Sequence, residues 1–264
     1  MENLDFLIDY LIKENKNIKV EELPKDAEDK KRLYRSLCNI RNPNKISSKY
    51  IEVENKFLKN ELDKKGVINN EDINILKKYK GVNLSIFEGD ITRLNVDAIV
   101  NAANSSGIGC FVPCHNCIDN AIFSASGVKL RLECSKTMEK IKVLKTGNAI
   151  ITKGYNLKSK YIIHTVGPIV YDNVTYENIE NLKNCYINSL KLAKENGVKV
   201  IAFPCISTGL FKFPSALASS IALETVKEYL DKNENSFEKI IFNVFSKKDY
   251  DIYLKNIGEV YSGI

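Results

Sequence analysis

The sequence has no run of about 18 consecutive apolar residues, the length needed to cross a lipid bilayer. It therefore predicts no membrane-spanning segment and no membrane partner. The chain begins with MENLDFLIDYLIKENK, which is acidic and amphipathic, whereas a secretory signal has a basic start and an unbroken apolar stretch. We accordingly expect a cytoplasmic protein.

Two nucleotide-binding motifs are also missing. Neither GxxxxGK[ST] nor GxGxxG occurs, so NTP hydrolysis and Rossmann-type dinucleotide binding are poorly supported. The formal net charge is +6, but the lysines are dispersed and mixed with acidic residues. Solvated surfaces explain this better than a nucleic-acid groove, and we expect no nucleic-acid partner. The positive excess would still favour an anionic ligand.

Histidine is scarce, with two residues in 264, whereas there are seven cysteines. So many thiols in a cytoplasmic chain argue against a disulfide framework. Three of the thiols flank one of the two histidines in a short segment: Cys110, Cys114, His115 and Cys117. The other cysteines are interpreted as small buried hydrophobic residues: Cys38, Cys134, Cys185 and Cys205.

The sequence changes character near residue 80. Residues 1–80 carry apolar side chains at helical spacing and predict an N-terminal helical extension. Residues 81–264 alternate between strands and helices, and this alternation predicts an α/β fold of three layers (α/β/α), with a sheet covered on both faces. The predicted strands are 82–87, 96–100, 149–152, 161–166, 199–205 and 239–245, and the predicted helices are 121–135, 177–196 and 214–230.

Polar residues follow several of the predicted strands, where ligands bind in such sheets. Asp90, after Gly89, can accept a hydrogen bond from an exocyclic amine such as that of adenine, or can instead cap a helix. Asn101 and Asn104, separated by two alanines, suit recognition of hydroxyl groups, or can instead stabilise a turn. Together these loops predict a cleft for a nucleotide-sized ligand.

Thiolate, imidazole and thiolate are the ligands that zinc prefers, so Cys110, His115 and Cys117 are candidate metal ligands. Adding Cys114 would close the shell and make a structural site. We favour three ligands with an open fourth position, because Cys114 directly precedes His115 and adjacent side chains tend to point apart. Cysteine–histidine catalysis and a reduced cysteine cluster without metal remain alternatives.

Two further segments carry candidate residues. Asp119 could hold or deprotonate a metal-bound water, or cap the helix that follows. The loop 207–214 leads into a predicted helix and can offer backbone amides to a pyrophosphate, with Phe211 or Phe213 stacking on a ribose or base. His164 is interpreted as structural.

In this order, these motifs resemble the macrodomain, an α/β/α module with a mixed sheet that binds ADP-ribose. The resemblance rests on GDIT (89–92), DAIVNAAN (97–104) and the Ser-Thr-Gly loop (207–209). The insertion GCFVPCHNCIDN (109–120) is similar to a zinc-containing subclass of microbial protein-ADP-ribose hydrolases. That subclass is often linked to sirtuin-type ADP-ribosyltransferases and lipoylated carrier proteins, and its members share the helical extension.

The resemblance implies a role for each candidate. Asp90 and Ile91 would hold the adenine, Asn104 would hold the distal ribose, and Asp119 would act with Asn104 in catalysis. Zn²⁺ would be the cofactor, bound by the three ligands named above. The pyrophosphate and distal ribose would be wrapped by Ser207, Thr208, Gly209, Leu210 and Phe211. Two residues depart from the pattern: Lys212 replaces an expected glycine, and Phe123 replaces an expected histidine.

From these roles we expect a monomeric hydrolase that cleaves the link between ADP-ribose and an acidic residue of a modified protein, with a lipoylated carrier protein as one candidate partner. Two alternatives stay open. The chain could be an ADP-ribose reader with structural zinc and negligible hydrolysis, or it could deacetylate O-acetyl-ADP-ribose.

Overall fold

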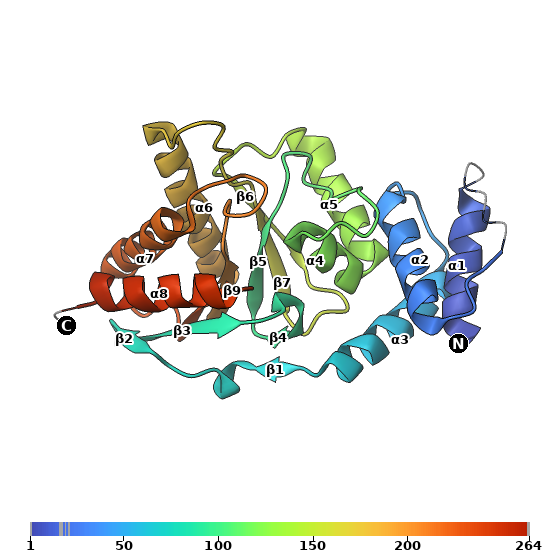
Figure 1. The fold of residues 1–264 in the computed structure, drawn as a ribbon, viewed down its shortest axis with the longest axis horizontal. Coiled ribbons are helices and arrows are strands. Elements are labelled where there is room, and N and C mark those ends of the chain that lie inside the picture. The colour runs from blue at the N-terminus through green and yellow to red at the C-terminus, as the bar shows by residue number, and fades with distance from the viewer. Residues whose placement is uncertain (1, 16–17, 19, 21, 263–264) are drawn as a thin grey trace.

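The computed structural model describes residues 2–15, 18, 20 and 22–262 (Figure 1). Its centre is a seven-stranded sheet in the order β2-β3-β9-β8-β5-β7-β6. The five inner strands are parallel to one another, and the two edge strands are antiparallel to their neighbours, so the sheet is mixed. The strands are β2 (Lys77–Tyr79), β3 (Val82–Glu88), β5 (Ala98–Ala102), β6 (Ala149–Lys153), β7 (Tyr161–Thr165), β8 (Val200–Pro204) and β9 (Lys239–Val244).

Helices cover both faces of this sheet. Successive strand residues point to opposite faces. Ala98 and Val100 therefore pack under one helical layer, and Ile99 packs under the other. The first layer is α6 (Tyr176–Glu195), α7 (Ser215–Lys232) and α8 (Lys247–Val260), and the second is α4 (Ile118–Ser126) and α5 (Val128–Ile141). The predicted three-layer α/β/α architecture is confirmed.

The chain begins with three helices that pack beside α4 and α5, at one end of the molecule (Figure 1): α1 (Glu2–Glu14), α2 (Ala27–Ile40) and α3 (Ser48–Lys65). Their own core includes the fully buried Leu7, Ile8 and Tyr50, together with Val128 from α5. Two short strands, β1 (Ile68–Asn69) and β4 (Leu94–Asn95), pair with each other outside the main sheet. Because β2 already pairs with β3, the main sheet starts a few residues before the expected boundary at 80–81.

The predicted helix 121–135 is two helices, α4 and α5, separated at Gly127. Gly127 has φ of +88°, a conformation that favours glycine, and a Cβ there would lie 2.6 Å from Glu54 Oε2. That carboxylate accepts a hydrogen bond from Val128 N at 3.0 Å, at the first residue of α5. A side chain from the extension therefore supports the start of α5, which the local sequence pattern could not reveal.

The five parallel strands end at the same edge of the sheet, so the loops that follow them lie together. These loops carry Asp90, Asn104, the cysteine-rich segment and residues 205–214. None of the helices in the described part of the chain is long and apolar enough to cross a membrane.

Candidate functional site

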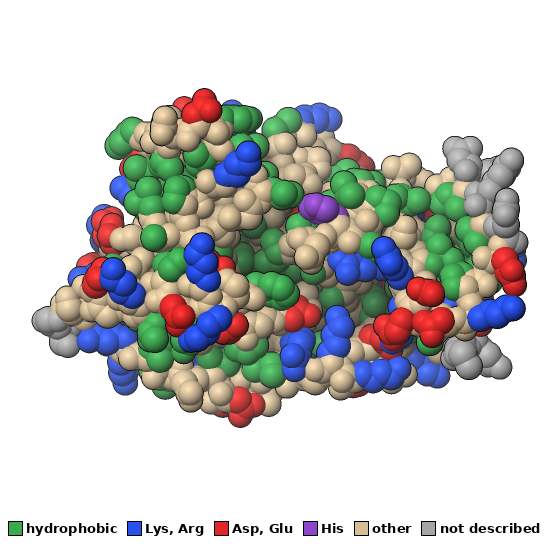
Figure 2. Space-filling view, viewed as in Figure 1, with side chains coloured by type: hydrophobic (Ala, Val, Ile, Leu, Met, Phe, Trp, Pro, Cys, Tyr) green, Lys and Arg blue, Asp and Glu red, His purple; other side chains and the backbone are tan. Residues whose placement is uncertain are grey.

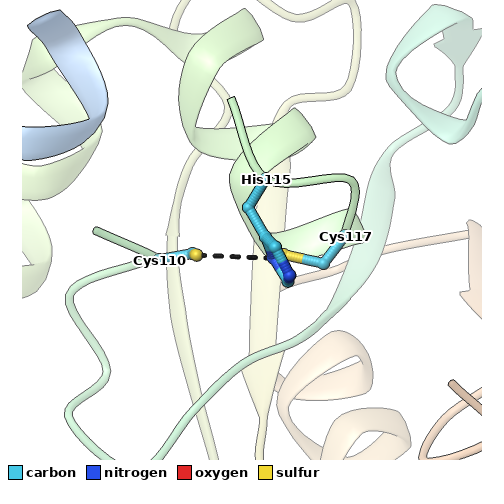
Figure 3. A group of neighbouring side chains, drawn as sticks. All are labelled: Cys110, His115 and Cys117. Carbon is cyan, nitrogen blue, oxygen red and sulfur yellow. Dashed lines mark hydrogen bonds between the residues drawn. The ribbon is translucent and has the colours of Figure 1, made fainter. Parts of the chain in front are cut away.

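Cys110, His115 and Cys117 converge at this edge of the sheet. Their donor atoms all lie within 4.8 Å of one another, and Cys110 Sγ is 3.7 Å from His115 Nδ1. Figure 3 shows Cys110 and Cys117 approaching from opposite sides, with the His115 side chain entering between them. Two sulfurs and one imidazole at this spacing can bind a single tetrahedral zinc ion and leave its fourth position open.

Cys114 does not join this cluster. Its φ is +51°, in the left-handed region, and its Sγ lies 3.3 Å from the main-chain oxygen of Arg32 on α2. The three-ligand alternative therefore agrees with the geometry, and a shell closed by Cys114 does not. Gly109 also has a positive φ, and a Cβ there would lie 2.7 Å from the ring of Phe123. The loop backbone at Gly109 therefore packs closely against Phe123, the aromatic residue that replaces the expected histidine.

Cys117 caps the start of α4, with its Sγ accepting a hydrogen bond from Asn120 N at 3.4 Å. Burial raises the pKa of the Cys117 thiol to about 11. Two residues further on, Asp119 is 4% exposed. Its Oδ1 accepts a hydrogen bond from Asn101 at 2.7 Å, and its Oδ2 accepts one from Asn104 at 3.3 Å. Burial raises the pKa of Asp119 to about 6, which suits a group that exchanges protons near neutral pH.

Asn101 is fully buried and faces Asp119 and His164, so the expected contact between Asn101 and a ligand hydroxyl is wrong. Its Nδ2 lies 3.0 Å from His164 Nδ1, and His164 Nε2 lies 2.9 Å from Thr152 Oγ1. Burial lowers the pKa of His164 to about 3, so the ring is neutral. If Asn101 Nδ2 donates to both partners, His164 carries its proton on Nε2. His164 is structural, as predicted. It positions the side-chain amide of Asn101, which in turn donates a hydrogen bond to Asp119.

Asp90 lies at the end of β3 and caps a short 3₁₀ helix (Ile91–Arg93). Its Oδ1 accepts hydrogen bonds from Thr92 N at 2.9 Å and Thr92 Oγ1 at 2.6 Å, while Oδ2 is 3.9 Å from Lys65 Nζ. The second oxygen can therefore still accept an amine from a ligand. The side chain of Ile91 is buried, which leaves its main chain to contact a ligand.

Phe245 was missed by the sequence analysis. It follows β9, where Gly89 N donates to Val244 O at 2.9 Å, and it is 79% exposed. An exposed aromatic ring beside the Asp90 loop can stack on a base. The signal was a phenylalanine at the very end of a predicted strand, where the next residues open a helix.

The loop 205–214 presents its backbone. Among the described residues, no acceptor receives the N–H groups of Gly209, Leu210 and Phe211, and Leu210 is 72% exposed. Ser207 and Lys212 adopt positive φ values of +67° and +56°. Lys212 thus has the backbone conformation for which glycine was expected. Consecutive free amides of this kind form an anion-binding concavity.

Two residues of that loop differ in burial. Phe213 is 2% exposed and packs in the core, so the alternative in which Phe213 stacks on the ligand is wrong. Phe211 is partly exposed, and its main-chain oxygen accepts a hydrogen bond from Val170 N at 2.9 Å. The Oγ of Ser207 is buried without a hydrogen-bond partner among the described residues. It lies so close to Gly167 that a Cβ added to this glycine would be 2.0 Å from the Oγ.

The face shown in Figure 2 is hollowed near its centre, with lysine and arginine side chains along the rim. The histidine colour appears at one edge of this hollow, and because His164 is fully buried, it marks His115. Because the donor atoms of Cys110 and Cys117 lie within 4.8 Å of that of His115, the candidate metal site borders this hollow.

Comparison with known proteins identifies the Macro domain over residues 100–222. The chain is 45% identical over 251 residues to the protein-ADP-ribose hydrolase of Treponema medium, covering 95% of this chain and 96% of that protein. It is 42% identical over 252 residues to the protein-ADP-ribose hydrolase of Staphylococcus aureus strain COL, and the match covers 95% of this chain and 93% of that protein.

Among solved structures, the Oceanobacillus iheyensis macrodomain with ADP matches with a TM-score of 0.64 and 36% identity, covering 72% of this chain and 96% of that one. The 251-residue match at 45% identity, which takes in almost the whole length of both chains, is sufficient to define the family. The chain belongs to the macrodomain family.

Proposed function

We propose that the protein is a protein-ADP-ribose hydrolase that releases ADP-ribose from an acidic residue of a modified protein, and that it binds one Zn²⁺ through Cys110, His115 and Cys117. The observation that supports this most strongly is the placement of a buried carboxylate, Asp119, directly after a three-donor cluster that has no fourth protein ligand among the residues the structure describes. The long matches to protein-ADP-ribose hydrolases support the substrate class.

The cleft suits ADP-ribose along its length. The free amides of Gly209 to Phe211 would bind the pyrophosphate, with Lys212 nearby as a positive charge. Asp90 and Phe245 would hold the adenine at one end, and Asn104 would contact the distal ribose at the other. Bound zinc would supply a Lewis acid at its open position, beside the ribose.

Asp119 would act on the attacking water. With its two oxygens fixed by Asn101 and Asn104, the carboxylate can take a proton from that water as the oxygen adds to the anomeric carbon. The bond between this carbon and the substrate carboxylate breaks, and the carboxylate leaves with the electron pair. The products are ADP-ribose and the restored acidic side chain.

The test is time-resolved release of ADP-ribose from a protein modified on acidic residues, with and without a zinc chelator. We expect release by the wild type to stop when zinc is removed and to return when zinc is restored. Cys110→Ser should lose both zinc and turnover, whereas Cys114→Ser, its matched control, should keep both because Cys114 faces α2. Full turnover by metal-free protein would sink the zinc assignment.

The same assay separates the alternatives. O-acetyl-ADP-ribose as the preferred substrate would contradict the protein-substrate proposal, and tight ADP-ribose binding without turnover would indicate a reader. On the resemblance alone, a lipoylated carrier protein is the first modified substrate to try. We further propose a monomer in the cytoplasm, which sedimentation and fractionation can check.

A further inference from the structure

One side of α2 lies against the metal loop, defined here as residues 109–117. Arg35 donates from Nε and Nη2 to Asn120 Oδ1, at 3.0 and 2.7 Å, and from Nη2 to the main-chain oxygen of His115 at 3.1 Å. Asn120 is fully buried, and its Nδ2 donates to Val112 O at 2.9 Å. The guanidinium therefore joins a candidate metal ligand to the first turn of α4, which Cys117 caps.

Asn39 lies one turn after Arg35, so both side chains project from the same face of α2. Its Oδ1 accepts a hydrogen bond from Cys114 N at 2.9 Å, and its Nδ2 donates to Ser124 Oγ on α4 at 3.1 Å. It is 1% exposed, which is unusual for an asparagine near the end of a helix. Its side-chain amide thus links the metal loop to α4.

Arg131 on α5 makes a third set of contacts between α2 and the start of the metal loop. The guanidinium of Arg131 donates to the main-chain oxygens of Ile108 and Cys110, at 2.9 and 3.1 Å. It also donates to three main-chain oxygens at the end of α2 and lies 4.1 Å from the ring centroid of Phe111. The backbone before the first ligand is therefore fixed to the end of α2 through one side chain.

The loop needs such support because little else orders it. It contains no helix or strand, and it holds two residues with positive φ, Gly109 and Cys114. Ordering each loop residue costs about 1–2 kcal/mol of backbone entropy. In a loop without such partners, metal binding itself would have to offset this entropy cost. The affinity of the loop for the metal would therefore be lower.

We propose that Arg35 and Asn39 are positioning residues, by which the N-terminal helices hold the three metal ligands in their converging geometry. This inference rests on the proposed zinc site. Neither residue contacts the sulfur or ring-nitrogen atoms that would bind the metal. Each acts through the main chain of the loop or through the side chain of Asn120. Partners of this kind around a metal site typically change metal affinity or activity by about 10–100-fold when removed.

The experiment measures Zn²⁺ affinity by competition with a chromophoric chelator, in the full-length protein, for Arg35→Leu and Asn39→Ala. We expect both variants to bind Zn²⁺ about 10–100-fold more weakly than the wild type. The affinity for ADP should stay within about twofold, because ADP lacks the distal ribose. Both variants should also release ADP-ribose more slowly at limiting zinc, and saturating zinc should restore part of that turnover.

Lys31→Leu is the matched control. It removes one positive charge from the same helix, together with ion pairs to Glu28 and Glu61 that stay within the extension. It should leave Zn²⁺ affinity unchanged. If all three variants weaken zinc equally, the effect is general loosening of the extension and the proposal is wrong.

Wild-type Zn²⁺ affinity in both positioning variants would also overturn it, while leaving the proposed function intact. A wild type that binds no zinc would overturn the proposed zinc site itself. Should Arg35→Leu fail to fold, judged by its thermal transition, the smaller change Asn39→Ala decides the outcome by the same chelator measurement.

Discussion

The two ends of the cleft are built in opposite ways. At the proposed metal end, formed by the metal loop and Asp119, side chains fix the geometry: Asp119, Asn101 and Asn120 are buried, and contacts from α2 and α5 reach the loop. At the proposed pyrophosphate end, residues 209–211, the chain is largely exposed and offers its free backbone amides. The difference teaches that the metal end is ordered by the protein before any ligand arrives, whereas the amides of the other end need an anion to satisfy them.

The largest expected effect comes from Asp119 at the metal end. Asp119→Asn should lower kcat by about 10²–10⁴-fold, because the amide cannot accept a proton from water. The affinity for ADP should be unchanged, since its proposed binding site lies at the other end of the cleft. Release kinetics and calorimetric titration with ADP measure the two effects separately. A rate within twofold of wild type would remove Asp119 from the chemistry.

A medium effect should come from Glu54, the buried carboxylate that supports α5. Burial raises its pKa from 4.5 to about 7. The unfolded chain therefore loses this proton first, and the free energy of unfolding falls as pH rises from about 4.5 to about 7. Relative to Glu54→Gln, the wild type should lose roughly 3 kcal/mol over this window, at 1.36 kcal/mol for each pKa unit.

Denaturant unfolding at several pH values measures this difference. Asp119, whose pKa is also raised, contributes with the same sign in both proteins and cancels in the comparison. Parallel stability curves for wild type and variant would show that Glu54 does not keep its proton in the folded state.

The smallest effect concerns the backbone of the pyrophosphate end. Lys212 has φ of +56°, a conformation that an L-residue adopts at some cost and glycine adopts freely. Lys212→Gly should therefore raise the free energy of unfolding by up to about 1 kcal/mol. Lys191→Gly, an exposed lysine inside α6, should lower it by about 1 kcal/mol. Thermal melts of both variants check the two signs, and a fall at both positions would contradict the argument.

Sequence patterns predicted every strand of the main sheet except β2, every covering helix except α8, and the loops that carry the site, because these depend on local periodicity. Separation of Cys114 from the ligand set followed from a local rule on adjacent side chains. The pattern did not predict the interruption at Gly127, where α5 starts with support from a carboxylate on a helix more than 70 residues earlier. Nor could it show that Asn101 is buried, which depends on His164 in a neighbouring strand.

The contacts of α2 with the metal loop were also beyond the sequence, because Arg35 and Asn120 are 85 positions apart. The sequence around a helical arginine is the same whether its side chain faces water or another segment of the protein. Phe245 was overlooked for a related reason: a lone aromatic residue after a strand is recognisable as a binding residue only when the loop beside it is known.

Arg131 has a consequence for how such a chain can change over generations. Its guanidinium donates both to the end of α2 and to the backbone that leads into the metal loop. A descendant that lost the helices would keep a partly buried cation with three acceptors missing, and one that lost the loop would leave it with two missing. Loss of either the helices or the loop is therefore penalised unless Arg131 changes as well, which couples the two segments over generations.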